Sequence, residues 1–356
     1  MKITETSGCC CSCSSTSGGQ TCGCAEKNCQ PPAIKTTTGI ITFSDRLDHL
    51  LARLGWRRSE HRVEPGMYRL GDPDAESPVF ASANYSLSFD ALRSSLAGID
   101  AWILVLDTKG INVWCAAGKG TFGTDELVRR IESSDLSLLV SHRMIIVPQL
   151  GAPGVSWQEV ARRTKFIVEY GPVRADDLPE YLETHMATPA MRRVEFSLRD
   201  RLVLTPVEFM HAALPALAAA AVLWFLGGPV ASLAAISAVL AGTVLFPLLL
   251  PVLPTRDFST KGMILGMIVS LPFAYVFGTD PNLPVWAGVL SAAAALLLIP
   301  AVISYLALNF TGCTPFTSRT GVKKEIFSYV KVMAGMAALG AISSIILGVS
   351  WILGVI

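Results

Sequence analysis

The chain of 356 residues is long enough for two folded units, and its 29 basic and 28 acidic side chains leave a formal net charge of +1. This balance, without a long run of one sign, argues against a nucleic-acid-binding protein. Seven of the nine cysteines fall in the N-terminal tail, so a disulfide framework spread through a small secreted domain is also excluded.

Residues 1–38 form this tail, which is rich in Ser, Thr and Gly and which we expect to be disordered. It lacks the continuous apolar core of a signal peptide, so we place the tail and the following domain in the cytoplasm. The clusters Cys9-Cys-Cys-x-Cys13 and Cys22-x-Cys24 could bind a soft metal such as Hg(II). The alternative is a thiol-bearing extension with no defined role.

Residues 39–190 predict a soluble α/β domain. Leucines at helical spacing predict a first helix over residues 43–56. Beyond it, short β-rich apolar runs alternate with helical patterns, the runs at 101–107, 143–149 and 165–169, and the helical patterns at 89–96, 125–133, 158–163 and 176–183. Such alternation is typical of βαβ units around a mostly parallel sheet, so we expect a Rossmann-like fold.

Ligands of such sheets bind beyond the carboxyl ends of the strands, so the loops 108–123 and 150–155 are the candidate site. The first loop is not a phosphate-binding P-loop, because Val113 stands where that pattern needs its first Gly, and Gly120 where it needs Ser or Thr. No Gly-x-Gly-x-x-Gly opens a helix after the strand, which argues against a dinucleotide. Zinc is also disfavoured, since Cys115 and the domain's scattered histidines lack ligand spacing.

One cysteine, Cys115, stands in the first loop among small residues that would let a broad planar ligand approach the backbone. Trp114 offers apolar area beside it, and Lys119 favours a thiolate. The alternative is a buried cysteine that serves as a small hydrophobe, which is the commoner role of this residue.

The second half of the chain is apolar from Pro206 onward. We expect a basic linker over 191–205 and then an all-α transmembrane domain of five helices over 206–356. Each predicted span approaches the length of about 20 residues that crosses a bilayer as a helix. The spans are 207–227, 229–253, 262–278, 284–308 and 327–355.

Basic residues in short connections stay on the cytoplasmic side of a membrane and so orient the spans. Here they occur before the first span, between the second and third, and between the fourth and fifth: Arg192, Arg193, Arg199 and Arg201; Arg256 and Lys261; Arg319, Lys323 and Lys324. The connections at 227–229 and around Asp280 carry none. We therefore expect a multi-pass protein of the inner (cytoplasmic) membrane with its N-terminal domain in the cytoplasm and its C-terminus outside.

The spans contain mainly Ala, Leu, Gly and Pro, with few charged groups at mid-membrane depth. A plain anchor is therefore favoured over a transporter. One connection, residues 309–325, exceeds what a linker needs and could dock the soluble domain or a partner.

The run Asn112-Val-Trp-Cys-Ala-Ala-Gly-Lys119 resembles the signature of the HgcA family, the membrane-bound corrinoid proteins of mercury methylation, which reads Asn-Val/Ile-Trp-Cys-Ala-Ala/Ser-Gly-Lys. The resemblance spans nearly the whole chain, because this family has a corrinoid domain followed by five spans. More distantly, the chain resembles the corrinoid iron–sulfur protein of the acetyl-CoA pathway, which shares the α/β cofactor domain but not the membrane half.

The resemblance implies a cobalamin-type corrinoid, with Cys115 as the catalytic residue and the lower axial ligand of cobalt, on a short capping helix. The Asp-x-His-x-x-Gly motif of other cobalamin enzymes does not occur in the chain. The second loop would contact the nucleotide tail of the corrinoid. The implied cofactor-binding residues are Asn112, Val113, Trp114, Cys115, Ala116, Ala117, Gly118, Lys119, Gly120, Gly151, Ala152, Pro153 and Gly154.

The implied function is a corrinoid-dependent methyltransferase that moves a methyl group from a methyl-cobalt corrinoid to Hg(II), producing methylmercury. A soft thiolate ligand donates electron density, which would let the methyl group leave as a carbanion equivalent or as a radical. The implied partners are HgcB, a ferredoxin-like protein with two 4Fe–4S clusters, as reductant, and a methyltetrahydrofolate-linked methyl donor. The alternatives are a membrane-tethered corrinoid methyl carrier of one-carbon and acetyl-CoA metabolism, and a non-catalytic scaffold.

Overall fold

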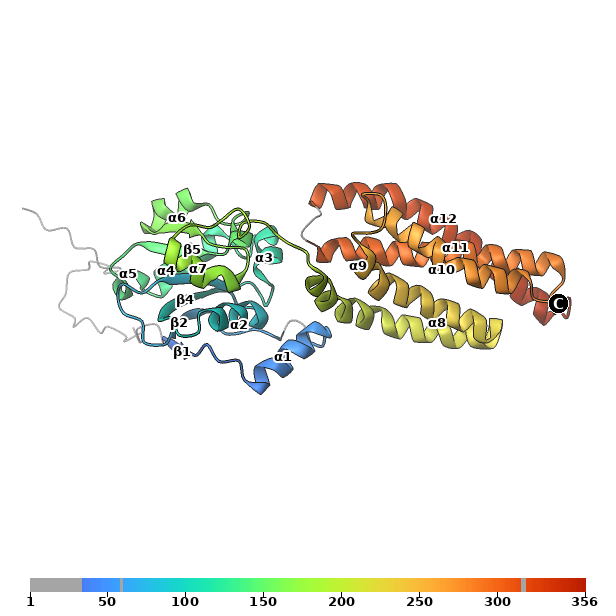
Figure 1. The fold of residues 1–356 in the computed structure, drawn as a ribbon, viewed down its shortest axis with the longest axis horizontal. Helices are drawn as coiled ribbons and strands as arrows, with labels where there is room; N and C mark the ends of the chain where they lie inside the picture. The colour runs from blue at the N-terminus through green and yellow to red at the C-terminus, as the bar shows by residue number, and fades with distance from the viewer. Residues whose placement is uncertain (1–33, 58–59, 315–317) are drawn as a thin grey trace, which may run out of the picture.

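The computed structural model describes residues 34–57, 60–314 and 318–356. An α/β unit is followed by an elongated bundle of apolar helices (Figure 1). The two cysteine clusters of the tail lie outside the described residues, so their proposed metal binding stays a prediction.

Six strands form one sheet in the order β1-β2-β4-β3-β5-β6. The strands are β1 (Lys35–Thr37), β2 (Gly66–Leu70), β3 (Val79–Ala83), β4 (Ala101–Leu106), β5 (Met144–Val147) and β6 (Ile167–Tyr170). β2 runs antiparallel to β4, and the other pairings are parallel. The predicted α/β domain is thus confirmed as a mixed sheet with helices, whereas a specifically Rossmann-like arrangement is not.

The three predicted strands correspond to β4, β5 and β6. β4 is buried at all of its residues, as its continuous apolar sequence indicates. The sequence pattern does not predict β3, although it too is buried throughout. Its composition, Val-Phe-Ala-Ser-Ala, carries little strand propensity, and its place between β4 and β5 supplies the stability that propensity does not.

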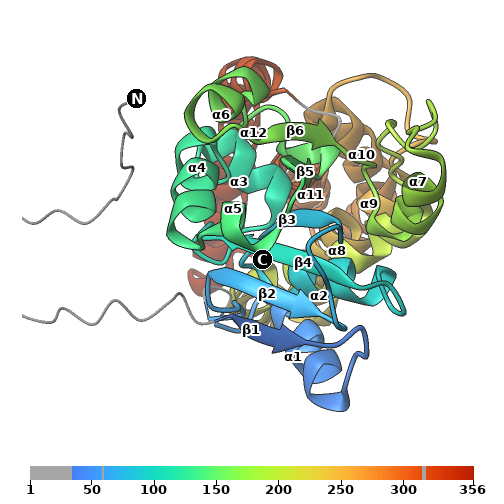
Figure 2. The same cartoon turned by 90° about the vertical axis from the view of Figure 1, so that its left-hand side faces the viewer.

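Helices cover both faces of the sheet (Figure 2). The helices of the α/β unit are α1 (Phe43–Arg53), α2 (Ser86–Ser95), α3 (Val113–Lys119), α4 (Thr124–Ser133), α5 (Leu136–Leu139), α6 (Trp157–Thr164) and α7 (Leu178–Thr184), with the 3-10 turns η1 (Gln149–Gly151) and η2 (Ala175–Asp177). α2 and α7 share an apolar cluster with Phe80 and Ile146 on one face. α4 and α6 share another with Leu104 and Val147 on the opposite face.

Among the described residues, four stretches of helix are long and apolar enough to cross a membrane: Leu198–Leu249, Phe258–Gly278, Val285–Phe310 and Thr320–Ile352. Their elements are α8 (Leu198–Leu240), the π-helical η3 (Ala241–Leu245), α9 (Phe246–Leu249), α10 (Phe258–Gly278), α11 (Val285–Phe310) and α12 (Arg319–Ile352), and the turn η4 (Thr311–Cys313) follows α11. The predicted count of five is not confirmed. Two predicted spans, 207–227 and 229–253, fall mainly within the single stretch Leu198–Leu249.

That first stretch is not one straight rod. Gly228 has φ 76 and ψ −174, a non-helical conformation that suits glycine, and Pro229 follows it. A straight helix would hold Arg201 and Leu248 about 70 Å apart. Instead, a guanidinium N–H of Arg201 donates to the carbonyl oxygen of Leu248 at 3.2 Å. The chain therefore folds back on itself within this stretch.

Small residues let α10 and α11 approach closely. A Cβ built on Gly266 would lie 2.4 Å from Cα of Pro300, and one on Gly262 would lie 2.7 Å from Cα of Ser304. Small residues one turn apart are the usual means of close helix contact in membranes. α12, by contrast, exposes much of its apolar surface, including Phe327. Exposed apolar side chains of this kind suit contact with lipid.

The two units touch beside the first turn of α8. Ser197 and Asp200 form a capping box that starts α8, and the Asp200 carboxylate also pairs with Arg174 of the α/β unit at 2.7 Å. The end of α1 lies close by, since a Cβ on Gly55 would come within 3.3 Å of Val207. α8 thus begins inside the segment predicted as a linker.

Candidate functional site

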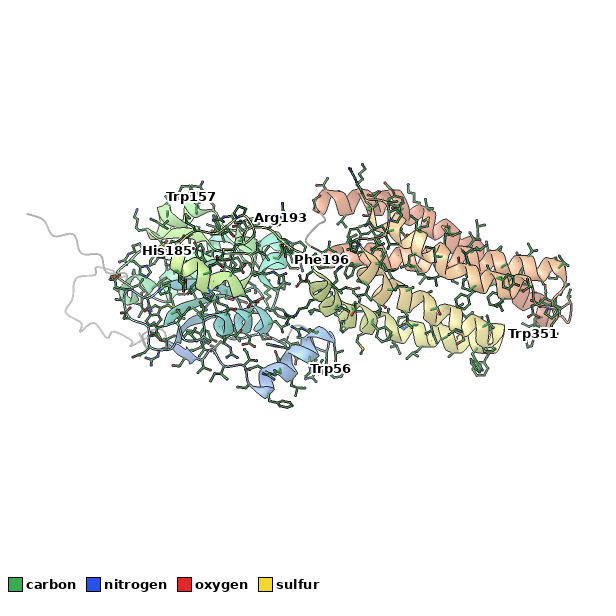
Figure 3. All side chains as sticks on the ribbon, viewed as in Figure 1. Trp56, Trp157, His185, Arg193, Phe196 and Trp351 are labelled. Atoms are coloured by element: carbon green, nitrogen blue, oxygen red, sulfur yellow. The ribbon has the colours of Figure 1, made fainter. Side chains whose placement is uncertain are left out.

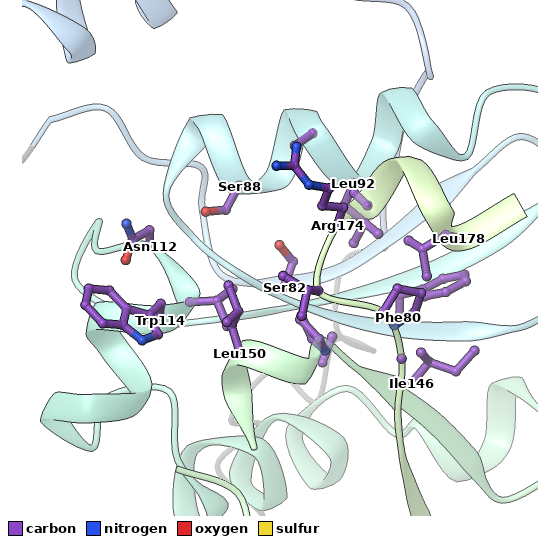
Figure 4. Close-up of a pocket in the computed structure, with 18 residues that line it drawn as sticks. Phe80, Ser82, Ser88, Leu92, Asn112, Trp114, Ile146, Leu150, Arg174 and Leu178 are labelled. Carbon is purple, nitrogen blue, oxygen red and sulfur yellow. The ribbon is translucent and has the colours of Figure 1, made fainter. Parts of the chain in front are cut away.

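A cavity of about 230 Å³ opens on the sheet face that carries α2 and α7, above the point where β3 and β5 meet (Figure 4). Phe80 and Ile146 line it from the strands, and Leu178 lines it from α7. At its other end lie Trp114 and Leu150, from the loops that follow β4 and β5.

The position of this cavity follows from the strand order. The chain passes from β3 to β4 on one side and then returns to β5 on the other, so β3 and β5 are neighbours whose connections diverge. A crevice forms where connections leave a parallel sheet in opposite directions, and ligands bind there. Residues that follow β4 and β5, Trp114 and Leu150, both line this crevice, and the binding role of the two loops stays a prediction.

The sequence Val113–Lys119 forms α3, a helix of 7 residues beside the cavity. Asn112 caps it, because the Asn112 side-chain oxygen accepts a hydrogen bond from the backbone N–H of Cys115 at 2.9 Å. Gly120 ends it in the left-handed conformation with φ 82. The short helix that the resemblance implies is therefore present.

Cys115 is half-buried, whereas the next two residues, Ala116 and Ala117, are buried in the core behind it. Within the described residues, Cys115 is not part of a disulfide. Its neighbour Trp114 lines the cavity. The core contacts of α3 therefore come mainly from Ala116 and Ala117. The half-buried position of Cys115 does not favour the alternative that it serves as a core hydrophobe.

Asn84 holds the loop that leads into α3. It lies at the end of β3 with an exposure of only 1%. Its side-chain oxygen accepts from the backbone N–H groups of Thr108 and Gly110, both at 3.0 Å. A buried amide that satisfies two backbone donors fixes the loop path. Sequence reasoning did not identify Asn84, and only its place directly after a strand could have suggested it.

The second loop packs against α3 and the residues that follow it. A Cβ on Gly154 would lie 2.1 Å from the carbonyl oxygen of Phe122 and 3.1 Å from Cα of Ala117, so only glycine fits there. The hydroxyl of Tyr170 donates to the carbonyl of Val155 at 2.6 Å. Burial raises the pKa of Tyr170, which keeps this hydroxyl protonated and able to donate.

The structure brings some of the predicted cofactor-binding residues to the cavity wall, namely Asn112, Val113 and Trp114. The others surround this wall without lining it: Cys115, Ala116, Ala117, Gly118, Lys119, Gly120, Gly151, Ala152, Pro153 and Gly154. Within this group, Gly118, Lys119 and Gly120 are exposed at the end of α3. Gly151 and Gly154 pack against the α3 region.

Two polar residues that the sequence analysis did not predict also line the cavity. Ser88 of α2 and Arg174, after β6, both line it. Nothing in their local sequence marks them, because they reach the site only through the packing of α2 and η2. Arg174 also binds Asp200, which links the cavity to the first turn of α8.

Fold and cavity together define a class: an α/β domain with a cavity at a topological switch point, followed by a bundle of membrane-type helices. Comparison with known proteins identifies a more specific similarity for the α/β unit. Residues 40–181 match the family of the CO dehydrogenase/acetyl-CoA synthase delta subunit. This match covers most of the α/β unit and stops before α8.

Individual proteins that are similar to this chain agree with the family match. The gamma subunit of the acetyl-CoA decarbonylase/synthase complex of Methanopyrus kandleri is 36% identical over 128 residues, which is 35% of this chain and 27% of the relative. The gamma 2 subunit of Methanosarcina mazei is 35% identical over 130 residues, with the same two shares. The chain thus spans about a quarter of the length of these relatives.

Proposed function

We propose that the α/β unit binds a corrinoid and takes part in corrinoid-mediated methyl transfer at a membrane. The observation that carries this proposal is the placement of Cys115 on a capped helix beside a switch-point cavity. The similarity of residues 40–181 to subunits of acetyl-CoA synthase complexes supports a corrinoid as the ligand class.

The residues present fit such a group. Drug-sized ligands occupy pockets of about 300–1,000 Å³, so a cavity of about 230 Å³ can take an edge or side group of a corrinoid but not its whole ring. The exposed end of α3 leaves room outside it, since a Cβ on Gly120 would meet nothing within 4 Å. A thiol also has the soft donor chemistry that late transition metals accept.

When bound, a corrinoid supplies a cobalt centre that can carry a methyl group. The residues of the chain would position it: Trp114 by apolar contact, and Cys115 as a sulfur donor to the metal. Asn112 and Asn84 would keep Cys115 in place through the hydrogen bonds described above. Because a thiolate donates electron density strongly, Cys115 would tune the reactivity of a bound metal.

For the methyl acceptor, we propose Hg(II), on the strength of the intact run Asn112–Lys119 and its resemblance to the mercury-methylation family. A second candidate is a membrane-tethered methyl carrier of one-carbon metabolism. The comparisons favour this second candidate, because the relatives they identify belong to acetyl-CoA decarbonylase/synthase complexes.

Reconstitution with cobalamin tests the cofactor and its ligand. Full-length protein should bind cobalamin, and Cys115→Ala should shift its Co(II) absorption and electron paramagnetic resonance spectra. Cys115→His should give a third spectrum, typical of a nitrogen ligand. Ser133→Ala, on an exposed position of α4, is the matched control and should leave the spectra unchanged. Identical spectra for wild type and Cys115→Ala would refute the axial role.

The acceptor is tested on protein loaded with an isotope-labelled methyl group. Addition of Hg(II) should release labelled methylmercury if mercury is the acceptor. Label that stays on the protein with Hg(II), but is lost to an acetyl-CoA synthase active site, would instead establish the methyl carrier.

We further propose that the apolar helices cross the membrane five times, with the α/β unit in the cytoplasm and the C-terminus outside. The break at Gly228 supports this count, because it allows Leu198–Leu249 to provide two crossings. We propose two partners: a ferredoxin-like protein with two 4Fe–4S clusters as reductant, and a methyltetrahydrofolate-linked methyl donor.

A further inference from the structure

A second cavity, of about 360 Å³, lies where the helix bundle begins. We name it the basic pocket, and its lining residues are Phe196, Arg201, Leu250, Pro251, Thr255, Arg256, Phe258 and Lys261. Phe196 marks its place at the junction of the two units (Figure 3). The lining comes from the start of α8, the loop after α9 and the start of α10.

The basic pocket contains three cations and no acid in its lining. The acidic residues that directly adjoin the lining cations in sequence have other partners: Asp200 pairs with Arg174, and Asp257 accepts from the hydroxyl of Tyr329 at 2.7 Å. Within the described ranges, Arg201, Arg256 and Lys261 form no salt bridge. The lining of the pocket therefore carries a net positive charge.

Two of these cations are held in place by backbone carbonyls. Arg201, only 8% exposed, donates to the carbonyl of Leu248 at 3.2 Å, and Lys261 Nζ donates to the carbonyl of Leu250 at 2.6 Å. Carbonyl oxygens satisfy hydrogen bonds but neutralise no charge. A buried guanidinium without a counter-ion carries a desolvation cost that an anion would relieve.

We propose that the basic pocket binds the phosphate group of an anionic phospholipid. A phosphate oxygen suits the charge-assisted hydrogen bonds that Arg256, Arg201 and Lys261 can offer. The walls favour a lipid over a free anion, because Phe196, Leu250 and Phe258 add apolar surface beside the cations. The pocket also lies at one end of the apolar helices, where lipid headgroups are found, and basic pockets between membrane helices bind such headgroups.

Lipid retention by the purified full-length protein in non-ionic detergent tests this assignment. The protein is incubated with phosphatidylglycerol or with phosphatidylcholine of the same acyl chains, and bound lipid is counted by native mass spectrometry. Wild type should retain phosphatidylglycerol in clear preference. Arg256→Gln should lower its affinity about fivefold, as expected for the loss of one cation at a membrane surface. Arg256→Gln with Lys261→Gln should lower it further.

Arg199→Gln is the matched control, because Arg199 is exposed in the first turn of α8 and does not line the pocket. It should retain phosphatidylglycerol as wild type does. Arg256 is exposed, so the single variant should fold even if the double variant does not, and circular dichroism checks this.

Three results would overturn the proposal. Equal retention of the two lipids by wild type would remove the role of the anionic headgroup. An equal loss in Arg199→Gln and Arg256→Gln would reduce the effect to general surface charge. Displacement of phosphatidylglycerol by inorganic phosphate at millimolar concentration would assign the pocket to a free anion.

Discussion

Two asparagine side chains control the geometry around Cys115. Asn84 fixes the loop before α3 through the N–H groups of Thr108 and Gly110, and Asn112 caps the helix through the N–H of Cys115. In both cases an amide oxygen accepts from backbone N–H groups that form no hydrogen bond within a strand or helix. The position of the thiol thus depends on short-range hydrogen bonds rather than on its own burial.

The cap can be removed without touching the cysteine. Asn112→Ala should destabilise the α/β unit by about 1 kcal/mol and loosen α3, because the N–H of Cys115 loses its acceptor. Asn112→Asp keeps an acceptor oxygen and should stay close to wild type. Thermal unfolding, together with the alkylation rate of Cys115 measured by peptide mass spectrometry, checks both variants. Equal behaviour of the two would show that the cap is unimportant.

His61 gives the molecule a pH-dependent contact. Its ring nitrogens lie 2.6 Å from an Asp48 carboxylate oxygen and 2.6 Å from the carbonyl oxygen of Trp56. Burial alone would lower the pKa of His61, but these two partners favour the charged form, and the net effect raises it above its usual value. The charged ring thereby ties the end of α1 to the segment before β2.

A raised pKa in the folded state means that the contribution of His61 is complete below its ordinary pKa of about 6.5 and is lost as the pH rises through the folded value. The difference in melting temperature between wild type and His61→Gln should therefore be largest at about pH 6 and should shrink toward alkaline pH. Thermal scans at several pH values measure it. A difference that grows with pH would contradict the assignment.

At the level of elements, α3 and the loop after β5 behave as one unit. Gly154 allows this loop to pass against Phe122 and Ala117, whereas Gly120 serves only as the left-handed end of α3. The sequence motif coincides with α3, whose first residues line the cavity, and its role as a binding site stays a prediction. It could not show that the glycines of the second loop serve packing, because that role appears only when two loops far apart in sequence meet.

Two glycine variants separate these roles. Gly154→Ala forces a Cβ into backbone atoms and should cost about 3 kcal/mol or more, displacing α3. Gly120→Ala meets open space and should cost only the left-handed backbone strain, about 1–2 kcal/mol. Chemical denaturation ranks the two, and the Cys115 alkylation rate should change mainly in Gly154→Ala. The reverse ranking would refute the packing role.

Across the whole molecule, local patterns predicted more of the fold than of the site. Apolar runs identified β4 to β6 and the membrane-type helices, because continuous burial leaves a continuous apolar sequence. The sequence pattern did not predict β1, β2 or β3, because their stability comes from neighbours distant in sequence, and β1 lies within residues 1–38, which we expected to be disordered. Arg174 and Ser88 reached the cavity in the same non-local way, so no local pattern marked them.

The fold-back at Gly228 makes a topological prediction. If Leu198–Leu249 crosses the membrane twice, as proposed above, the total would be five, and the α/β unit and Ile356 would lie on opposite sides of the membrane. A reporter fused after Ile356 that is active only outside the cytoplasm, such as alkaline phosphatase, should be active. The same reporter inserted after Glu183 should be inactive. Activity at both sites or at neither would contradict an odd number of crossings.

The sparse burial of α12 also has a mechanical consequence. This last helix packs on α11 and turns most of its remaining surface outward. A pulling force applied at Ile356 would therefore extract α12 first, in a separate low-force step, while the tightly seated pair α10 and α11 resists until the force rises. The order in which the bundle comes apart would then run backward along the chain, from its most loosely held segment inward.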